Sequence, residues 1–230
     1  MKINRVIHQM WFDGLDQAPS KYKPGMDSWK RENKDYQYIF WDKFNISAFI
    51  ENYYPEYSKK WHSLDQMIKK CDSARYFILH KLGGVYADLD TFAHKGIDSL
   101  ILDQDLDNYS IILSEESLDP QAWKSEVSKK MAEEHNLRRI IGNAIMITEK
   151  NQNFWLNFLD KSFKKSSLPI LESFATWHLS KFIEEYSGET NIKILPYDFL
   201  LSVQIKPNSY VTHSYDASWF DLTKDRPWIV

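Results

Sequence analysis

The sequence predicts an α/β fold in which helices cover a central sheet. Short apolar, β-rich runs alternate along the chain with segments of helical periodicity, which is typical of layered α/β domains. Hydrophobic residues make up 43% of the 230 residues, enough for one substantial core. A glycine pair also separates the longest amphipathic segment from a short apolar run. We therefore expect a single domain over residues 1–230.

The first half of the chain predicts alternating strands and helices. We expect strands at residues 5–11, 36–41 and 85–87, and helices at residues 24–33, 45–53 and from about residue 63 to residue 82. Ser63 and Gln66 have the spacing of a capping box and predict the start of the third helix. On that helix an apolar stripe recurs at three- and four-residue steps, which predicts a buried face made of Met67, Cys71, Ala74, Ile78 and Leu82.

The second half is less regular. We expect strands at residues 109–113, 140–148 and 192–195, the last ended by Pro196, and helices at residues 154–163 and 171–186. Between them, residues 117–138 are polar and charged, which indicates an excursion from the core with helical character. No internal repeat or low-complexity tract is present.

The most informative stretch is the helix, glycine break and strand that end in two aspartates. Asp72 and Arg75 share a helix face beside the apolar stripe, and Gly83-Gly84 ends that helix. Asp88 and Asp90 then follow the short strand. Ligands bind at the carboxyl ends of strands in open α/β sheets, and two carboxylates there suit Mg²⁺ or Mn²⁺ together with a phosphate.

An Asp-x-Asp triplet by itself has little specificity, because such triplets also form ordinary solvated turns. This chain contains two more, in the run Asp103-Gln-Asp105-Leu-Asp107. The preceding strand, the glycine pair and the Asp-x-x-Arg helix distinguish Asp88 and Asp90 from them.

These motifs together resemble a known family. The pattern Asp72-x-x-Arg75, Gly83-Gly84-x-Tyr86-x-Asp88-x-Asp90 is similar to the signature of glycosyltransferase family 32, whose members contain a DXD motif. More distantly it resembles the glucosylating domains of clostridial toxins. Further similarity lies in residues 5–12, in Ser28-Trp29-Lys30 and Tyr38-Ile-Phe-Trp-Asp42, in Asn143-Ala144, and in His213 with Ser218-Trp219.

The resemblance implies a single-domain, Rossmann-like nucleotide-sugar transferase fold of the GT-A type, with a mixed central sheet flanked by helices. Residues 5–95 are expected to form the nucleotide-sugar-binding half, and residues 96–230 the acceptor side with a C-terminal active-site segment. The implied enzyme is a metal-dependent hexosyltransferase that moves a sugar from a UDP- or GDP-sugar to a hydroxyl of a glycan or lipid-linked oligosaccharide. The resemblance also implies retention of configuration and a role in surface polysaccharide biosynthesis.

The resemblance assigns roles to individual residues of the donor site. Asp72 and Arg75 are expected at the donor sugar or diphosphate, with an ion pair on the helix surface as the alternative. Tyr86 and Asn143 are expected among the donor-binding residues. Trp11 is expected to stack on the nucleobase, with a buried core position as the equal alternative. His8, on the same strand, is expected to be structural.

The metal site is expected to use Asp88 and Asp90, with Asp90 the direct ligand and Asp88 at the ribose or behind a water. His213 is a candidate third ligand for Mn²⁺ or Mg²⁺. Ser218 and Trp219 are candidates for diphosphate binding, the latter through its indole N–H. Glu115 and Glu116 either face the acceptor or lie in an exposed turn.

Composition excludes several classes of function. A net charge of −3 argues against a nucleic-acid binder. The single Cys71 excludes an internal disulfide and a cysteine zinc cluster. Residues 1–20 lack the apolar run of a signal peptide and no apolar run is long enough to span a bilayer, so we expect a cytoplasmic protein. The sequence leaves its oligomeric state open.

Lys161, Lys164 and Lys165 lie near Phe158 and Phe163 and leave a peripheral membrane contact open. An ordinary solvated helix face is the alternative.

Two other functions fit parts of the pattern. Asp88-Leu-Asp90-Thr91 also matches the nucleophile motif of haloacid-dehalogenase-like phosphatases. In that fold the motif follows the first strand, whereas here about 85 residues precede it, and no later Asp-Asp pair is present. A non-catalytic nucleotide-sugar-binding module is the second alternative. Nucleotide-sugar hydrolysis, phosphomonoester hydrolysis or neither would distinguish the three.

Overall fold

The computed structural model describes residues 2–116, 130 and 132–216 of the chain. Two 3₁₀ turns, η1 (Leu15–Gln17) and η2 (Ser20–Tyr22), precede the first helix. The strands are β1 (Val6–Met10), β2 (Gln37–Trp41), β3 (Gly84–Ala87), β4 (Thr91–Ala93), β5 (Ile111–Ser114), β6 (Ile145–Thr148), β7 (Ile192–Leu195) and β8 (Val211–His213). The helices are α1 (Lys23–Glu32), α2 (Lys43–Tyr53), α3 (Pro55–His62), α4 (Met67–Leu82), α5 (Ile97–Asp103), α7 (Asn153–Lys164), α8 (Ile170–Ser173), α9 (Thr176–Glu185) and α10 (Tyr197–Leu200).

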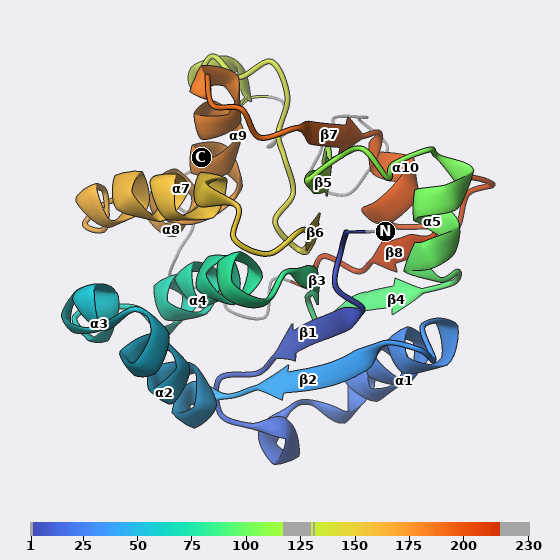
Figure 1. The fold of residues 1–230 in the computed structure, drawn as a ribbon, viewed down its shortest axis with the longest axis horizontal. Helices are drawn as coiled ribbons and strands as arrows, with labels where there is room; N and C mark the ends of the chain where they lie inside the picture. The colour runs from blue at the N-terminus through green and yellow to red at the C-terminus, as the bar shows by residue number, and fades with distance from the viewer. Residues whose placement is uncertain (1, 117–129, 131, 217–230) are drawn as a thin grey trace.

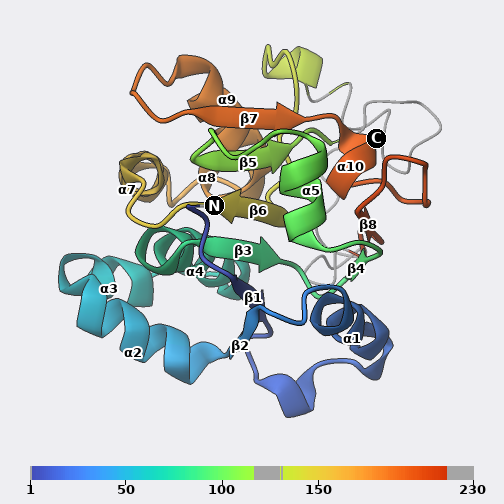
Figure 2. The same cartoon turned by 45° about the vertical axis from the view of Figure 1, so that its right-hand side comes forward.

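A six-stranded mixed sheet in the order β2-β1-β3-β6-β5-β7 forms the centre of the molecule, as predicted (Figure 1). Only β6 runs against its neighbours. The carboxyl ends of the other five strands and the beginning of β6 therefore lie along one edge. A separate ladder of β4 and β8 lies beside this sheet (Figure 2).

Helices cover both faces of the sheet. Helices α2, α3, α4, α7, α8 and α9 lie on one side, and α1, α5 and α10 lie on the other (Figure 1). Successive strand residues alternate between the two cores, as the period of a strand requires: Val85 and Ala87 pack into one core, and Tyr86 packs into the other. Among the described residues, none of the helices is both long and apolar enough to cross a bilayer.

The glycine break after α4 is confirmed. Gly83 and Gly84 have φ of 63° and 90°, which glycine adopts without strain. A Cβ on Gly84 would also lie 2.4 Å from the carbonyl oxygen of Val6. The two glycines thus turn the chain from α4 directly into β3 against β1.

The predicted capping box at Ser63 is wrong. Residues 55–62 form their own helix, α3, which begins at Pro55, a residue favoured in a first helical turn. Ser63 follows the end of α3, and its Oγ donates to the carbonyl of Lys60. The next helix begins at Met67 without a side-chain cap, and Met67 itself is exposed rather than part of a buried stripe.

Other differences concern short elements. The helix expected at residues 171–186 is divided into α8 and α9, because Ala175 is extended. The strand expected at residues 140–148 is confined to β6, preceded by an isolated bridge between Glu115 and Ile141. Strands β4 and β8 and helix α5 were not predicted. Most of the polar excursion expected at residues 117–138 lies outside the described residues.

Candidate active site

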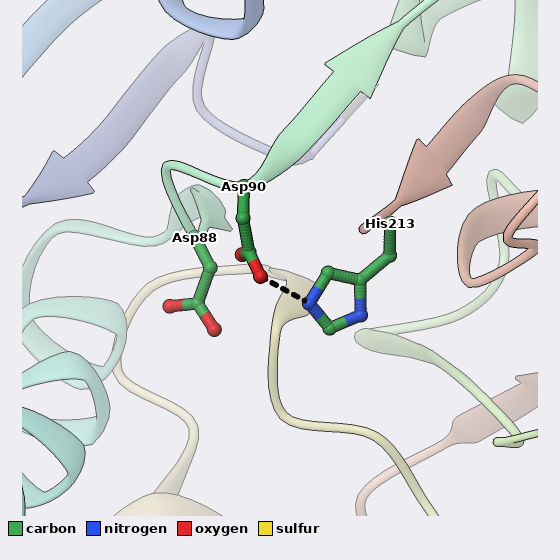
Figure 3. Close-up of side chains that lie close together, drawn as sticks. All are labelled: Asp88, Asp90 and His213. Carbon is green, nitrogen blue, oxygen red and sulfur yellow. Dashed lines mark ion pairs between the residues drawn. The ribbon is translucent and has the colours of Figure 1, made fainter. Parts of the chain in front are cut away.

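Asp88, Asp90 and His213 converge at the edge of the sheet where β3 ends (Figure 3). One ligand-type atom from each lies within 4.8 Å of the others. The His213 Nε2 is 3.2 Å from the Asp90 Oδ2, and the two side chains are only 10% and 13% exposed. The two carboxylates suit Mn²⁺ or Mg²⁺, and the imidazole adds a nitrogen ligand that is more typical of a transition-metal ion such as Mn²⁺. The described residues thus fit the predicted metal.

Backbone pairing fixes these three side chains relative to one another. Thr91, the first residue of β4, pairs with His213 at the end of β8. The N–H of Asp88 donates to the carbonyl of Ala144 at 2.8 Å, and the N–H of Asp216 donates to the Asp90 Oδ2 at 2.9 Å. The cluster therefore depends on contacts among three distant segments.

The pKa values of the Asp88 and Asp90 carboxylates are shifted in opposite directions. Burial raises the pKa of Asp88, and the charge of Asp90 adds to the rise against the opposing Arg75 guanidinium. Burial also acts to raise the pKa of Asp90, but the charge and hydrogen bond of His213 outweigh it, so that this pKa is lowered. Asp90 is therefore the more readily ionised of the two carboxylates.

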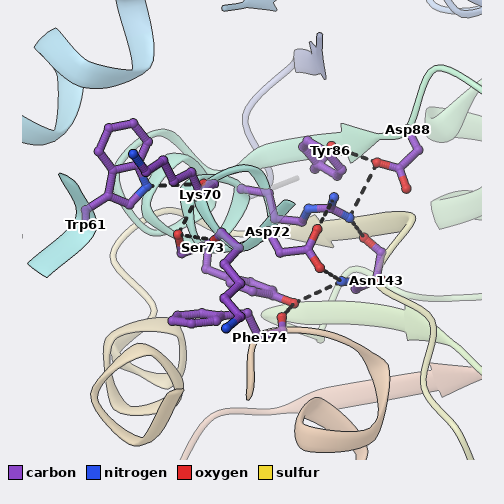
Figure 4. Close-up of polar contacts among 11 residues, drawn as sticks. Trp61, Lys70, Asp72, Ser73, Tyr86, Asp88, Asn143 and Phe174 are labelled. Carbon is purple, nitrogen blue, oxygen red and sulfur yellow. Dashed lines mark hydrogen bonds and ion pairs between the residues drawn. The ribbon is translucent and has the colours of Figure 1, made fainter. Parts of the chain in front are cut away.

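The Asp72–Arg75 pair lies in the interior and not on a helix surface (Figure 4). Their side chains are 5% and 6% exposed. The guanidinium donates to the Asp72 Oδ1 at 2.5 Å and to the Asn143 carbonyl at 2.8 Å, and lies 3.4 Å from the Asp88 Oδ1. It also covers the ring of Tyr86, 4.6 Å from the ring centroid. A surface ion pair, the alternative considered for these two residues, is excluded.

Hydrogen bonds link this pair to the aspartate turn. The Tyr86 hydroxyl donates to the Asp88 Oδ1 at 2.7 Å, and the Asn143 amide donates to the Asp72 Oδ2 at 3.4 Å. Burial raises the pKa of Asp72 to about 6, against the opposing charge of Arg75. The Nε of Arg75 is buried and has no partner among the described residues. The Arg75 guanidinium thus contacts two carboxylates, those of Asp72 and Asp88, while its Nε–H makes no hydrogen bond to the described residues.

The structure places the remaining predicted residues as follows. Trp11 follows β1, is partly buried, and packs in a small cluster that includes Tyr22 and Leu89. Leu89 is the central residue of the aspartate triplet, so Trp11 lies next to the turn. His8 is fully buried and its Nδ1 accepts from the Trp41 indole, as expected of a structural residue. Ser218 and Trp219 lie outside the described residues.

Three further residues lie at the site. Tyr215 and Thr91 were not predicted from the sequence as site residues, and the sequence leaves the role of Glu116 open. The ring of Tyr215 is 3.9 Å from that of His213. Burial acts to lower the pKa of His213, but the charge and hydrogen bond of Asp90 outweigh it, and the charges of Asp88 and Glu116 add to the rise. Burial raises the pKa of Tyr215, and the charge of Glu116 adds to it. Glu115 instead pairs with Arg139 at the surface. Thr91 was considered only as part of the phosphatase motif.

Comparisons with known proteins agree with this geometry. Residues 19–107 match the family model described as the glycosyltransferase sugar-binding region containing DXD motif. The chain is 39% identical over 103 residues to inositol phosphoceramide mannosyltransferase 1 of Schizosaccharomyces pombe, which covers 44% of this chain and 32% of that protein. It is 34% identical over 106 residues to the initiation-specific alpha-1,6-mannosyltransferase of Candida albicans, over 44% of this chain and 27% of that protein.

Solved structures show the same fold at low sequence identity. Mouse xyloside xylosyltransferase 1 superimposes with a TM-score of 0.54 at 12% identity, over 92% of this chain and 97% of that one. The PaToxG glycosyltransferase superimposes with a TM-score of 0.53 at 14% identity, over 80% and 69% of the two chains. The predicted GT-A glycosyltransferase fold is thereby confirmed. The segment that matches the DXD-containing family model, residues 19–107, includes the Asp88–Asp90 turn.

Proposed function

We propose that the protein is a metal-dependent mannosyltransferase that uses a nucleoside diphosphate sugar as donor. The carrying observation is the cluster of Asp88, Asp90 and His213 next to the buried Asp72–Arg75 pair, at the ligand-binding edge of a glycosyltransferase fold. The relatives named above are mannosyltransferases by name, which favours mannose as the hexose. The matched segment spans about a third of those relatives, so the activity of the whole protein is part of this proposal.

In this proposal Asp88, Asp90 and His213 hold Mn²⁺ or Mg²⁺. When bound, the cation neutralises the diphosphate as it leaves the sugar. Arg75 is proposed to donate to a sugar hydroxyl or phosphate oxygen, and Asp72 to accept from sugar hydroxyls. Trp11, which packs in a cluster with Leu89 of the turn, is proposed to stack on the nucleobase.

The acceptor is proposed to be a hydroxyl of a glycan or of a lipid-linked sugar, bound on the side of residues 96–230. Glu116 is the described acidic group on that side whose charge reaches His213. We propose retention of configuration at the transferred carbon, which NMR of the initial product would test. The role in surface polysaccharide synthesis and the cytoplasmic location stay predictions, to be tested by glycan analysis and cell fractionation.

A panel of nucleotide sugars incubated with Mn²⁺ tests the proposal. We expect slow hydrolysis of one nucleoside diphosphate mannose, lost with excess chelator and lost in Asp90→Asn. Asp105→Asn is the matched control, because Asp105 belongs to another aspartate triplet, is exposed, and has a left-handed φ of 50° that asparagine tolerates.

Full activity in excess chelator would contradict the metal role. Cleavage of a phosphomonoester instead would favour the phosphatase alternative, although the motif follows the third strand of the chain rather than the first. Neither activity, with nucleotide-sugar binding retained, would indicate a binding module.

A further inference from the structure

Helix α1 packs directly on the aspartate turn through the Ser28-Trp29 element, to which the proposed function gives no role. Trp29 is fully buried, and its indole Nε1 donates to the Thr91 Oγ1 at 2.9 Å. The Ser28 Oγ accepts from the N–H of Ala93 at 2.9 Å and donates to the carbonyl of Gly25 at 2.6 Å. The helix is thus attached at two points to the strand that follows the turn.

Gly25 allows this close approach. A Cβ at this position would lie 2.6 Å from the carbonyl oxygen of Thr91 and 3.0 Å from that of Leu89. Both atoms belong to the backbone, so neither can turn aside as the end of a flexible side chain can. The backbone of α1 therefore lies in van der Waals contact with the turn, so a displacement of the turn would have to displace the helix as well.

Thr91 transmits this contact to the proposed ligands. Its hydroxyl donates to the carbonyl of Asp88 at 2.5 Å, and its N–H donates to the same carbonyl at 3.3 Å. Its backbone also pairs with His213. One buried residue, through its hydroxyl and its backbone, thus joins the turn that carries Asp88 and Asp90 to the strand that carries His213.

The direction of these hydrogen bonds follows from the groups themselves. An indole N–H can only donate, so the Thr91 hydroxyl accepts from Trp29, and its single proton is directed to Asp88. We propose that Trp29 and Thr91 are positioning residues, which hold the backbone of the turn so that the Asp88, Asp90 and His213 side chains are set at cation-binding distance before the ion arrives. This inference rests on the proposed metal-dependent function.

The chain contains a matched control for the same chemistry. The Trp155 indole donates to the Thr148 Oγ1 at 3.2 Å, and both residues are fully buried. Thr148 pairs with Gly84 at the start of β3, the end of that strand opposite to Asp88. Loss of this second tryptophan–threonine bond therefore perturbs the fold in a similar way, away from the site.

Titration with Mn²⁺ alone, followed by the EPR signal of the free ion, tests the proposal on folded protein. We expect Thr91→Val to weaken Mn²⁺ binding by roughly tenfold, as loss of an outer partner of a metal ligand does. Trp29→Phe should weaken it less, because the hydroxyl can still donate to Asp88. Thr91→Ser keeps the hydroxyl and should bind Mn²⁺ within about twofold of the wild-type affinity. The control Thr148→Val should also bind within about twofold of wild type, although it should lose about as much thermal stability as Thr91→Val.

Four results would overturn the inference. Thr91→Val with wild-type affinity would do so, as would Thr91→Ser as weak as Thr91→Val, since the hydroxyl would then be irrelevant. Equal weakening in Thr148→Val would show that general destabilisation is the cause. A wild-type protein that binds no Mn²⁺ would contradict the proposed function together with this inference, whereas normal wild-type binding with an unaffected Thr91→Val would contradict the inference alone.

Discussion

Replacement of Arg75 by methionine should destabilise the protein in a pH-dependent way. The guanidinium is the counter-charge of Asp72 at 2.5 Å and lies 3.4 Å from Asp88. Removal of one partner of a buried ion pair costs about 3–5 kcal/mol. Burial already raises the pKa of Asp72 to about 6. In the Arg75→Met variant the Asp72 carboxyl should therefore take up a proton near neutral pH. Because protonation removes the unpaired charge, we expect the lower end of that range, a loss of about 3 kcal/mol at pH 6.

The pH dependence follows from the sign of that shift. Without Arg75 the pKa of Asp72 rises further, so native Arg75→Met holds a proton that the wild type has already released. Its stability relative to wild type should then fall by up to about 1.4 kcal/mol per pH unit above pH 6, until Asp72 ionises in the variant as well.

Urea denaturation at pH 6 and pH 8 measures both effects. The double variant Arg75→Met/Asp72→Asn removes the unpaired carboxyl and should recover part of the loss, as a double-mutant cycle would show. A loss below about 1 kcal/mol that does not change between pH 6 and pH 8 would refute the reasoning, since it would mean that the pair behaves as a solvated one. A double variant less stable than Arg75→Met would also refute it.

Three further changes probe the site and the core. Asp90→Asn should abolish chelator-sensitive hydrolysis, yet shift the unfolding free energy by no more than about 1 kcal/mol, because asparagine still accepts from the N–H of Asp216; a large stability loss with activity retained would count against Asp90 as a ligand. Trp11→Ala should weaken nucleotide binding by about 1–3 kcal/mol in a calorimetric titration and change turnover less; unchanged affinity would assign Trp11 to the core. Burial lowers the pKa of both His8 and His178 to about 4, so each contributes stability above pH 6.5 that is lost as the pH falls towards 4, and His178→Asn should make the urea midpoint less sensitive to acid in that window.

Much of the site was predictable because its signals are local. Residues 72–90 form one continuous helix–turn–strand unit, whose periodicity and glycines are visible without knowledge of the rest of the chain. The carboxyl ends of strands in a mostly parallel sheet also meet along one edge, which explains why Asp88 and Trp11 lie close together.

The remainder depends on contacts that local periodicity does not specify. His213 reaches the aspartate turn through β4 and β8, two strands of three residues each, too short to show an alternating pattern. The family resemblance supplied His213 and Asn143, and the residues alone would not have. The break between α3 and α4 was missed because Ser63 and Gln66 imitate a helix start, whereas the Ser63 hydroxyl is used at the end of α3. The interior position of Asp72 and Arg75 was missed because the sequence cannot show that the segment containing Asn143 covers them.

The reversed direction of β6 has a consequence for how this protein could diversify. The chain leaves β5 and enters β6 at the same edge of the sheet. The connection between these two strands therefore begins and ends at the edge where Asp88, Asp90 and His213 lie. A change of length between residues 116 and 140 would leave every rung of the sheet in place, whereas Asn143 and Ala144 at the end of the connection hold Arg75 and Asp88. Under the proposed function, acceptor preference could therefore change within that part while the donor-binding residues stay in place.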